Sequence, residues 1–100
     1  MVDGLHPIVW TPDFVRDVSL AVEYVAKVLR APIAARNLLE GIDAQLENVR
    51  AMPTTATLRK GSNGERFYML SYKNWNIYYV IESETIKAVG LKHQLQRQFL

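Results

Sequence analysis

The segment RFYMLSYKNWNIYYVI, residues 66–81, decides the fold of this 100-residue chain. Aromatic and β-branched residues dominate it, and these residue types favour strands. Lys73 and Asn74 interrupt the pattern as a tight turn would. The segment therefore predicts two strands, 66–72 and 75–81, joined in an antiparallel hairpin, with the second strand covered on at least one face.

Turn-forming residues on both sides of this hairpin predict one more strand on each side. The sequence GSNG at 61–64 separates the hairpin from a strand at 55–60, and the turn at 83–84 separates it from a strand at 85–91. Consecutive strands joined by short turns pair antiparallel. We therefore expect an antiparallel meander of three to four strands, followed by a polar, basic tail at 92–100.

The N-terminal half of the chain has a helical pattern. A short strand at 6–10 leads to Thr11, a good N-cap, and to Pro12, which suits the first position of a helix at 12–30. Pro32 breaks the pattern and can open a second helix. The apolar residues of each helix recur every three or four positions, as Phe14, Val18, Ala21, Val22, Val25 and Leu29 in the first and Ala35, Leu38, Ile42, Leu46 and Val49 in the second. Helices joined so tightly predict an antiparallel hairpin.

The order of these elements predicts an α+β fold in a single domain spanning residues 1–100. An N-terminal strand precedes the two-helix hairpin, and the meander packs on the helices. Gly41 lies inside the second predicted helix, where glycine costs about 1 kcal/mol relative to alanine. It marks either a close contact of that helix or a tolerated residue.

The composition favours a globular protein without metal or disulfide chemistry. Hydrophobic residues make up 49% of the chain and charged residues 22%, and there is no cysteine. His6 and His93 are far apart, with no carboxylate at ligand spacing, so we expect no metal and no cofactor. The start has no signal-peptide pattern, and no apolar run approaches the roughly 20 residues of a membrane span. A cytoplasmic location without a membrane partner is therefore expected.

The charge is distributed unevenly between the two halves of the chain. Residues 1–50 contain five Lys/Arg and seven Asp/Glu, whereas residues 51–100 contain seven and three. A basic second half could face a phosphate backbone or an acidic protein partner. An ordinary fluctuation in composition explains the imbalance equally well.

Several short motifs occur in a defined order along the chain. They are IVWTPDF at 8–14, AARNLL at 34–39 with Ile42, Pro53, the hairpin at 68–81, and IKAV at 86–89 followed by Lys92 and His93. Over residues 8 to about 97, their order and spacing resemble the RelE/ParE superfamily of toxins from type II toxin–antitoxin and plasmid stabilisation systems. The predicted order of elements is also the order in that superfamily.

The resemblance implies a toxin that is neutralised by a cognate antitoxin encoded beside it, and a heterotetramer of the two proteins is compatible with it. RelE-like members are ribosome-dependent mRNA endoribonucleases, or mRNA interferases, which inhibit translation. ParE-like members bind DNA gyrase and block replication without cleaving RNA. Fold alone does not choose between these targets. Our first interpretation is the RelE-like enzyme acting on the ribosome and mRNA, and the alternative is the ParE-like gyrase inhibitor.

RNA cleavage of the RelE type needs groups that move a proton and stabilise a pentavalent phosphate. His93 is the candidate acid or base, because histidine titrates near neutrality. Arg66 is the candidate phosphate clamp. Further residues could position RNA by charge or by base stacking, namely Arg59, Lys60, Lys73, Lys92, Arg97, Tyr72 and Phe99. Ordinary roles as surface charges, as cross-strand packing for Tyr72 and as a tail anchor for Phe99 remain open.

The sequence departs from the RelE pattern where positive charge would be needed. Phe67 and Met69 stand where that pattern has two lysines on one strand face, and Asn76 stands where an arginine is usual after the turn. The basic tail around His93 also resembles that of ParE members. The chain therefore either uses a sparser, histidine-based site or does not cleave RNA.

Overall fold

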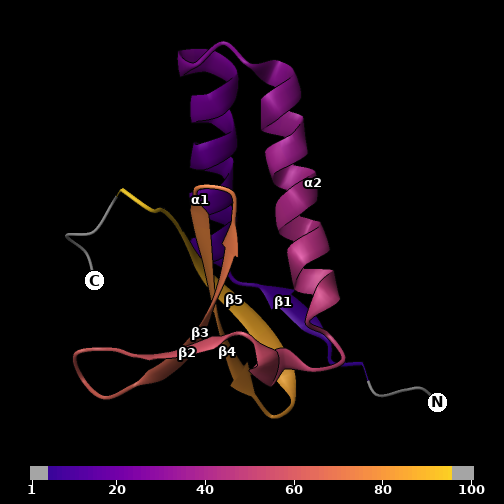
Figure 1. Ribbon diagram of the computed structural model, residues 1–100, viewed down its shortest axis with the longest axis vertical. Coiled ribbons are helices and arrows are strands. Elements are labelled where there is room, and N and C mark those ends of the chain that lie inside the picture. The colour runs from indigo at the N-terminus through magenta and orange to yellow at the C-terminus, as the bar shows by residue number, and fades with distance from the viewer. Residues whose placement is uncertain (1–4, 96–100) are drawn as a thin grey trace.

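The computed structural model describes residues 5–95 (Figure 1). The elements in chain order are β1 (Ile8–Trp10), α1 (Pro12–Glu23), the π-helical turn η1 (Tyr24–Val28), α2 (Pro32–Asn48), the 3-10 turn η2 (Pro53–Thr55), β2 (Thr57–Lys60), β3 (Arg66–Tyr72), β4 (Trp75–Glu82) and β5 (Thr85–His93). The two long helices stand side by side as a hairpin that projects from the sheet (Figure 1). The expected α+β fold is confirmed.

The sheet has five strands in the order β1-β5-β4-β3-β2. Strands β2 to β5 form the predicted antiparallel meander, and Tyr72, Trp75 and His93 meet side by side at one end of it. Strand β1 pairs parallel to β5, with Ile8 opposite Ile86. The first and last strands of the described chain are therefore neighbours.

Four strand bounds differ from those predicted by the sequence. Strand β1 begins at Ile8 and not at residue 6. Strand β2 begins at Thr57 because residues 53–55 form a 3-10 turn, and β4 extends by one residue to Glu82. Strand β5 extends to His93 because the residues at 92 and 93 pair with β4, opposite Asn76 and Trp75. The prediction that His93 lies beyond the last strand was wrong.

Thr11 connects the start of α1 to the sheet. Its hydroxyl accepts a hydrogen bond from the backbone N–H of Phe14 at 3.2 Å and donates one to the carbonyl of Ala88 at 2.8 Å. Its own backbone N–H also donates to Ala88. The predicted N-cap therefore also fixes the helix against β5.

The first helix ends in a wide turn that changes which residues face the core. The Leu29 N–H donates to the Tyr24 carbonyl, five residues back, as in a π-helix. Phe14, Val18, Ala21 and Val25 are buried as predicted, but Leu29 is 56% exposed. The prediction for Leu29 was wrong, because the extra residue in this turn rotates the following side chains away from the stripe.

Helix α2 packs against β3 through Gly41. A Cβ atom at this glycine would lie 2.1 Å from Cζ of Tyr72, far closer than any van der Waals contact. The Tyr72 hydroxyl also reaches the Asn37 carbonyl, at 3.4 Å. Of the two explanations for Gly41, the close contact is correct. The predicted apolar stripe of α2 is buried throughout.

The hydrophobic core lies between the helix hairpin and one face of the sheet. Its largest fully buried side chains are Tyr79, Phe14, Ile42, Leu46, Ile77 and Ile86. The Tyr79 hydroxyl donates a hydrogen bond to the Pro53 carbonyl. Burial, and to a lesser extent the neighbouring Tyr68, raises the pKa of Tyr79 to about 12. Within residues 5–95, the helices are too short or too polar to cross a membrane.

Candidate functional site

The candidate acid or base, His93, lies at the end of β5 beside Trp75. The two rings pack edge to face, with centroids 4.9 Å apart and planes at 87°. The His93 Nδ1 atom accepts a hydrogen bond from the backbone N–H of Leu95 at 3.2 Å. In the neutral imidazole, the proton is therefore on Nε2. The ring is half-buried and is held by aromatic packing and by the turn that follows the strand.

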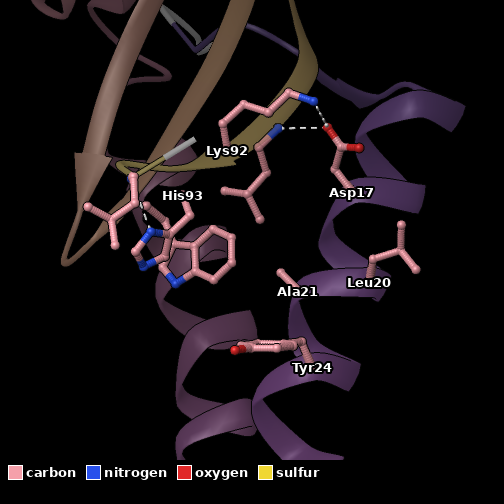
Figure 2. A pocket seen from close by; sticks show the side chains of 9 residues that line it. Asp17, Leu20, Ala21, Tyr24, Lys92 and His93 are labelled. Atoms are coloured by element: carbon pink, nitrogen blue, oxygen red, sulfur yellow. Dashed lines mark hydrogen bonds and ion pairs between the residues drawn. The ribbon is translucent and has the colours of Figure 1, made fainter. Parts of the chain in front are cut away.

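A pocket of about 540 Å³ lies next to this histidine, between α1 and the end of β5 (Figure 2). Its lining is mostly apolar and consists of Asp17, Leu20, Ala21, Tyr24, Trp75, Leu91, Lys92, His93 and Leu95. Leu20 and Tyr24 are 59% and 50% exposed. A pocket with apolar walls and a few polar groups suits the binding of another molecule better than it suits the stabilisation of charge.

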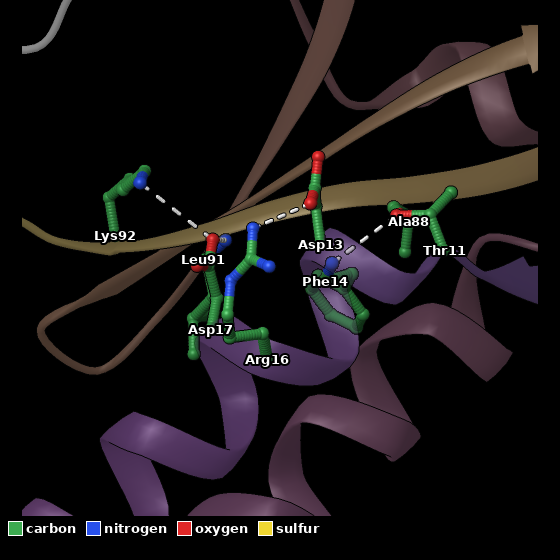
Figure 3. Close-up of polar contacts among 8 residues, drawn as sticks. All are labelled: Thr11, Asp13, Phe14, Arg16, Asp17, Ala88, Leu91 and Lys92. Atoms are coloured by element: carbon green, nitrogen blue, oxygen red, sulfur yellow. Dashed lines mark hydrogen bonds and ion pairs between the residues drawn. The ribbon is translucent and has the colours of Figure 1, made fainter.

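Asp17 closes one side of this pocket and joins α1 to β5 (Figure 3). Its Oδ2 accepts a hydrogen bond from the Leu91 backbone N–H at 3.0 Å and lies 3.7 Å from the Lys92 ammonium. Strand β1 pairs with β5 only as far as Ala88, so no strand lies beside Leu91 on that edge of β5. The Asp17 carboxylate therefore accepts the hydrogen bond that a neighbouring strand would otherwise accept from the Leu91 N–H. Asp17 thus stabilises the packing of the helix and neutralises part of the charge of Lys92.

The candidate phosphate clamp, Arg66, lies at the other end of the sheet. It begins β3 and pairs with Lys60 of β2, while Arg59 pairs with Phe67. Arg66 is six residues before Tyr72, which shares the sheet end of His93, so the two ends are separated by about 20 Å at roughly 3.3 Å per residue. The structure therefore does not bring Arg66 and His93 together.

The remaining candidates for RNA binding divide between these two ends. Arg59 and Lys60 are exposed and lie with Arg66. Lys73 occupies the β3–β4 turn near His93, with its ammonium 5.8 Å from the centre of the Tyr72 ring. Lys92 approaches Asp17. Arg97 and Phe99 lie outside the described residues.

Tyr72, which was a candidate for base stacking, packs against α2 at Gly41 and joins the edge of the core. Of the two roles left open for it, packing is the one that the structure supports. Tyr72 packs against helix α2 as well as against the neighbouring strand β4.

An exposed apolar stripe on α1 and η1 was missed by the sequence analysis. Leu20, Tyr24 and Val28 follow one another every four residues and are 59%, 50% and 62% exposed. The spacing was visible in the sequence, but the core stripe of the same helix already accounted for its helical period. This stripe leads from the pocket towards the end of the helix hairpin.

Residues 5–95 contain no group of three His, Cys, Asp or Glu side chains that could hold a metal ion. The arrangement offers an apolar pocket at one end of the sheet and a basic cluster at the other. Lys92 lines both the pocket beside His93 and a hollow that includes Arg66.

Comparison with known proteins agrees with this description. A solved structure titled "Chromosomal ParDE TA system from P. aeruginosa" has a similar fold, with a TM-score of 0.74. The similarity covers 91% of this chain and 98% of that chain, at 13% sequence identity. No curated protein matches the sequence.

The family model "ParE toxin of type II toxin-antitoxin system, parDE" matches residues 8–97. The chain therefore belongs to the ParE toxin family and is the toxin of a type II toxin–antitoxin system. Family membership does not by itself give the mechanism of this chain.

Proposed function

We propose that this toxin acts by binding DNA gyrase and blocking replication, and that it does not cleave mRNA. The observation that carries the proposal is the separation of Arg66 from His93 by about 20 Å along the sheet. Cleavage would require both groups to reach the same phosphate, within hydrogen-bond distance of the reacting oxygens. Membership of the ParE family points to the same mechanism. The first interpretation of the sequence, a RelE-like enzyme, has less support.

The packing of the two candidate groups also favours a binding protein. The His93 ring is fixed by Trp75 and Leu95. The adjacent Lys92 approaches Asp17, and Lys73 lies in the β3–β4 turn at the same end of the sheet. Arg66 has only Arg59 and Lys60 as described basic neighbours on the adjacent strand. Among residues 5–95, the candidate arginine clamp Arg66 and the candidate proton-transfer group His93 therefore lie at different ends of the sheet.

The test uses purified toxin, DNA gyrase and relaxed plasmid. We expect the toxin to inhibit supercoiling in proportion to its concentration and to leave transcripts intact when translating ribosomes are supplied. In cells, expression should induce the SOS response before translation falls. Unaffected supercoiling together with cut transcripts would refute the proposal, and loss of cutting in both His93→Ala and Arg66→Ala would then establish the ribonuclease.

We also propose that the cognate antitoxin covers the exposed stripe of Leu20, Tyr24 and Val28 and the adjoining pocket. An apolar helix face of this kind accepts an amphipathic helix through side chains at regular spacing. Exposed apolar patches on a small protein commonly mark such interfaces. The location of toxin and antitoxin is the cytoplasm in this proposal.

Charge substitutions on α1 test the antitoxin surface. Leu20→Glu and Tyr24→Glu should weaken binding of the antitoxin encoded beside this gene by at least about tenfold, because each places a charge in an apolar contact. Val15→Glu is the matched control, since Val15 is 45% exposed on a different side of the same helix. Equal binding by all three variants would exclude this surface.

A further inference from the structure

The face of the sheet that points away from the helices carries apolar side chains that no helix or strand within residues 5–95 covers. Tyr68, Leu70 and Tyr72 of β3 pack on the core, so the alternate residues Phe67 and Met69 point to the opposite face. By the same alternation, Tyr78 and Val80 of β4 point there, whereas Ile77 and Tyr79 are core residues. We call this surface the outer sheet face.

A β-bulge shapes the outer sheet face into a hollow. Tyr78 pairs with Gly90 and Tyr79 pairs with Ala88, which leaves Val89 as an additional residue in β5. An extra residue bends its strand and increases the local twist. Gly90 has no side chain to place beside Tyr78. The result is a hollow of about 330 Å³ between β3 and β5, whose floor includes Phe67, Tyr78, Val80 and Val89.

A second hollow continues the first along the sheet. It has a volume of about 280 Å³, shares Phe67 and Tyr78 with the first, and reaches Arg59 and Lys60 in β2. The two aromatic rings pack edge to face between the hollows, with centroids 5.5 Å apart. Together the hollows form one groove across β3, which is apolar near the bulge and more polar towards the β2–β3 hairpin.

The rim of this groove is basic. Arg66 and Lys92 lie around the first hollow and Arg59 and Lys60 around the second, against the single carboxylate of Glu65. Lys92 approaches Asp17, but within residues 5–95 no ion pair involves the other three cations. Their charge is therefore available to neutralise acidic groups of a partner.

The shape of the groove favours a protein segment over a nucleic acid. Tyr78 is only 9% exposed, so its ring does not present an open face for base stacking. An aliphatic or aromatic side chain can instead enter a hollow of this size and lining. The three cations Arg59, Lys60 and Arg66 would then face Asp or Glu residues beside that anchor.

We propose that the outer sheet face binds an acidic segment of the target protein, with an apolar side chain of that segment seated in the groove. This inference rests on the proposed function, in which the target is DNA gyrase. It places the target on the sheet and the antitoxin on the helix hairpin, so the two partners use different surfaces of the toxin. Attraction between opposite charges would make the association with the target sensitive to salt.

The experiment measures the affinity of purified gyrase for the toxin and for two charge variants. In the first, Arg59→Glu and Lys60→Glu are combined, and both positions are exposed, so the fold should persist. In the control, Arg30→Glu and Arg36→Glu make the same change in charge at exposed positions on the helix hairpin. A third variant, Val80→Glu, places a charge in the floor of the groove.

We expect the Kd for gyrase to rise at least about tenfold in the Arg59/Lys60 variant and in Val80→Glu, and to stay within about twofold in the control. Circular dichroism should be unchanged in all variants, and binding of the antitoxin should be unchanged in the two groove variants. If every variant binds gyrase as tightly as the wild type does, the inference is overturned and the proposed function stays intact. A loss of antitoxin binding alone would assign this face to the antitoxin instead. If the wild-type toxin does not bind gyrase, the proposed function and this inference fail together.

Discussion

Replacing Gly41 with alanine tests whether Tyr72 is held against α2 or is available to a ligand. The new Cβ atom would lie 2.1 Å from Cζ and 2.3 Å from the hydroxyl oxygen of Tyr72, so the ring would have to move. Overpacking of this kind costs about 1–3 kcal/mol. Removing a glycine from a helix interior contributes about 1 kcal/mol in the opposite direction. We therefore expect Gly41→Ala to lower the free energy of unfolding by about 1 kcal/mol.

A double-mutant cycle separates these two effects. Tyr72→Leu removes the ring atoms that overlap with the new Cβ and keeps an apolar side chain at the position. In that background Gly41→Ala should stabilise the protein by about 1 kcal/mol, because only the gain in helix propensity remains. The coupling energy between the two sites is then about 2 kcal/mol.

Urea unfolding followed by circular dichroism measures all four proteins. A difference of 1 kcal/mol corresponds to roughly 4–8 °C in Tm for a domain of this size, so thermal melts give an independent check. If Gly41→Ala changes the stability equally with and without the tyrosine ring, the packing of Tyr72 on α2 is refuted. Base stacking by Tyr72 would then again be a possible role.

Three further predictions concern polar groups of the fold. Thr11→Ala should lower the free energy of unfolding by about 1–2 kcal/mol, since it removes the cap on the Phe14 N–H, and urea unfolding measures the loss. Asp17→Ala should cost about 1–3 kcal/mol and increase hydrogen exchange at the Leu91 amide, and unchanged exchange there would contradict the contact. Because the pKa of Tyr79 is raised from 10.0 to about 12, the folded state keeps this proton longer than the unfolded state. Stability should therefore fall by about 2–3 kcal/mol between pH 10 and 12. Tyr79→Phe should be less stable at pH 7 but should lack this part of the decline, and a parallel decline in both proteins would refute the assignment.

Most of the fold could be predicted from the sequence because local signals and the hydrophobic pattern agree. Thr11 and Pro12 mark the start of α1, and the buried stripe of α2 has a regular helical spacing. The parallel pairing of β1 with β5 could not be predicted, because it joins residues that are 78 positions apart. The π-helical turn at 24–28 was also missed, since nothing in its sequence distinguishes it from an α-helix.

The candidate site was predicted less well than the fold. Residue type identified His93 and Arg66 as suitable groups, but the distance between them depends on strand register and on which end of each strand they occupy. The outer sheet face could not be recognised because its hollow depends on the bulge at Val89. Phe67 and Met69, which depart from the RelE pattern, are part of that face. The residues that weakened the enzyme interpretation therefore point to the binding surface.

The parallel pair of β1 and β5 also constrains when the chain can fold during its synthesis. Ile8 and Trp10 must wait for Ile86 and Ala88, and Thr11 needs the carbonyl of Ala88 for its contacts with the sheet. Contacts between such distant positions form slowly, because the intervening chain loses much entropy. A nascent chain whose β5 has not yet left the ribosome therefore cannot form the complete five-stranded sheet.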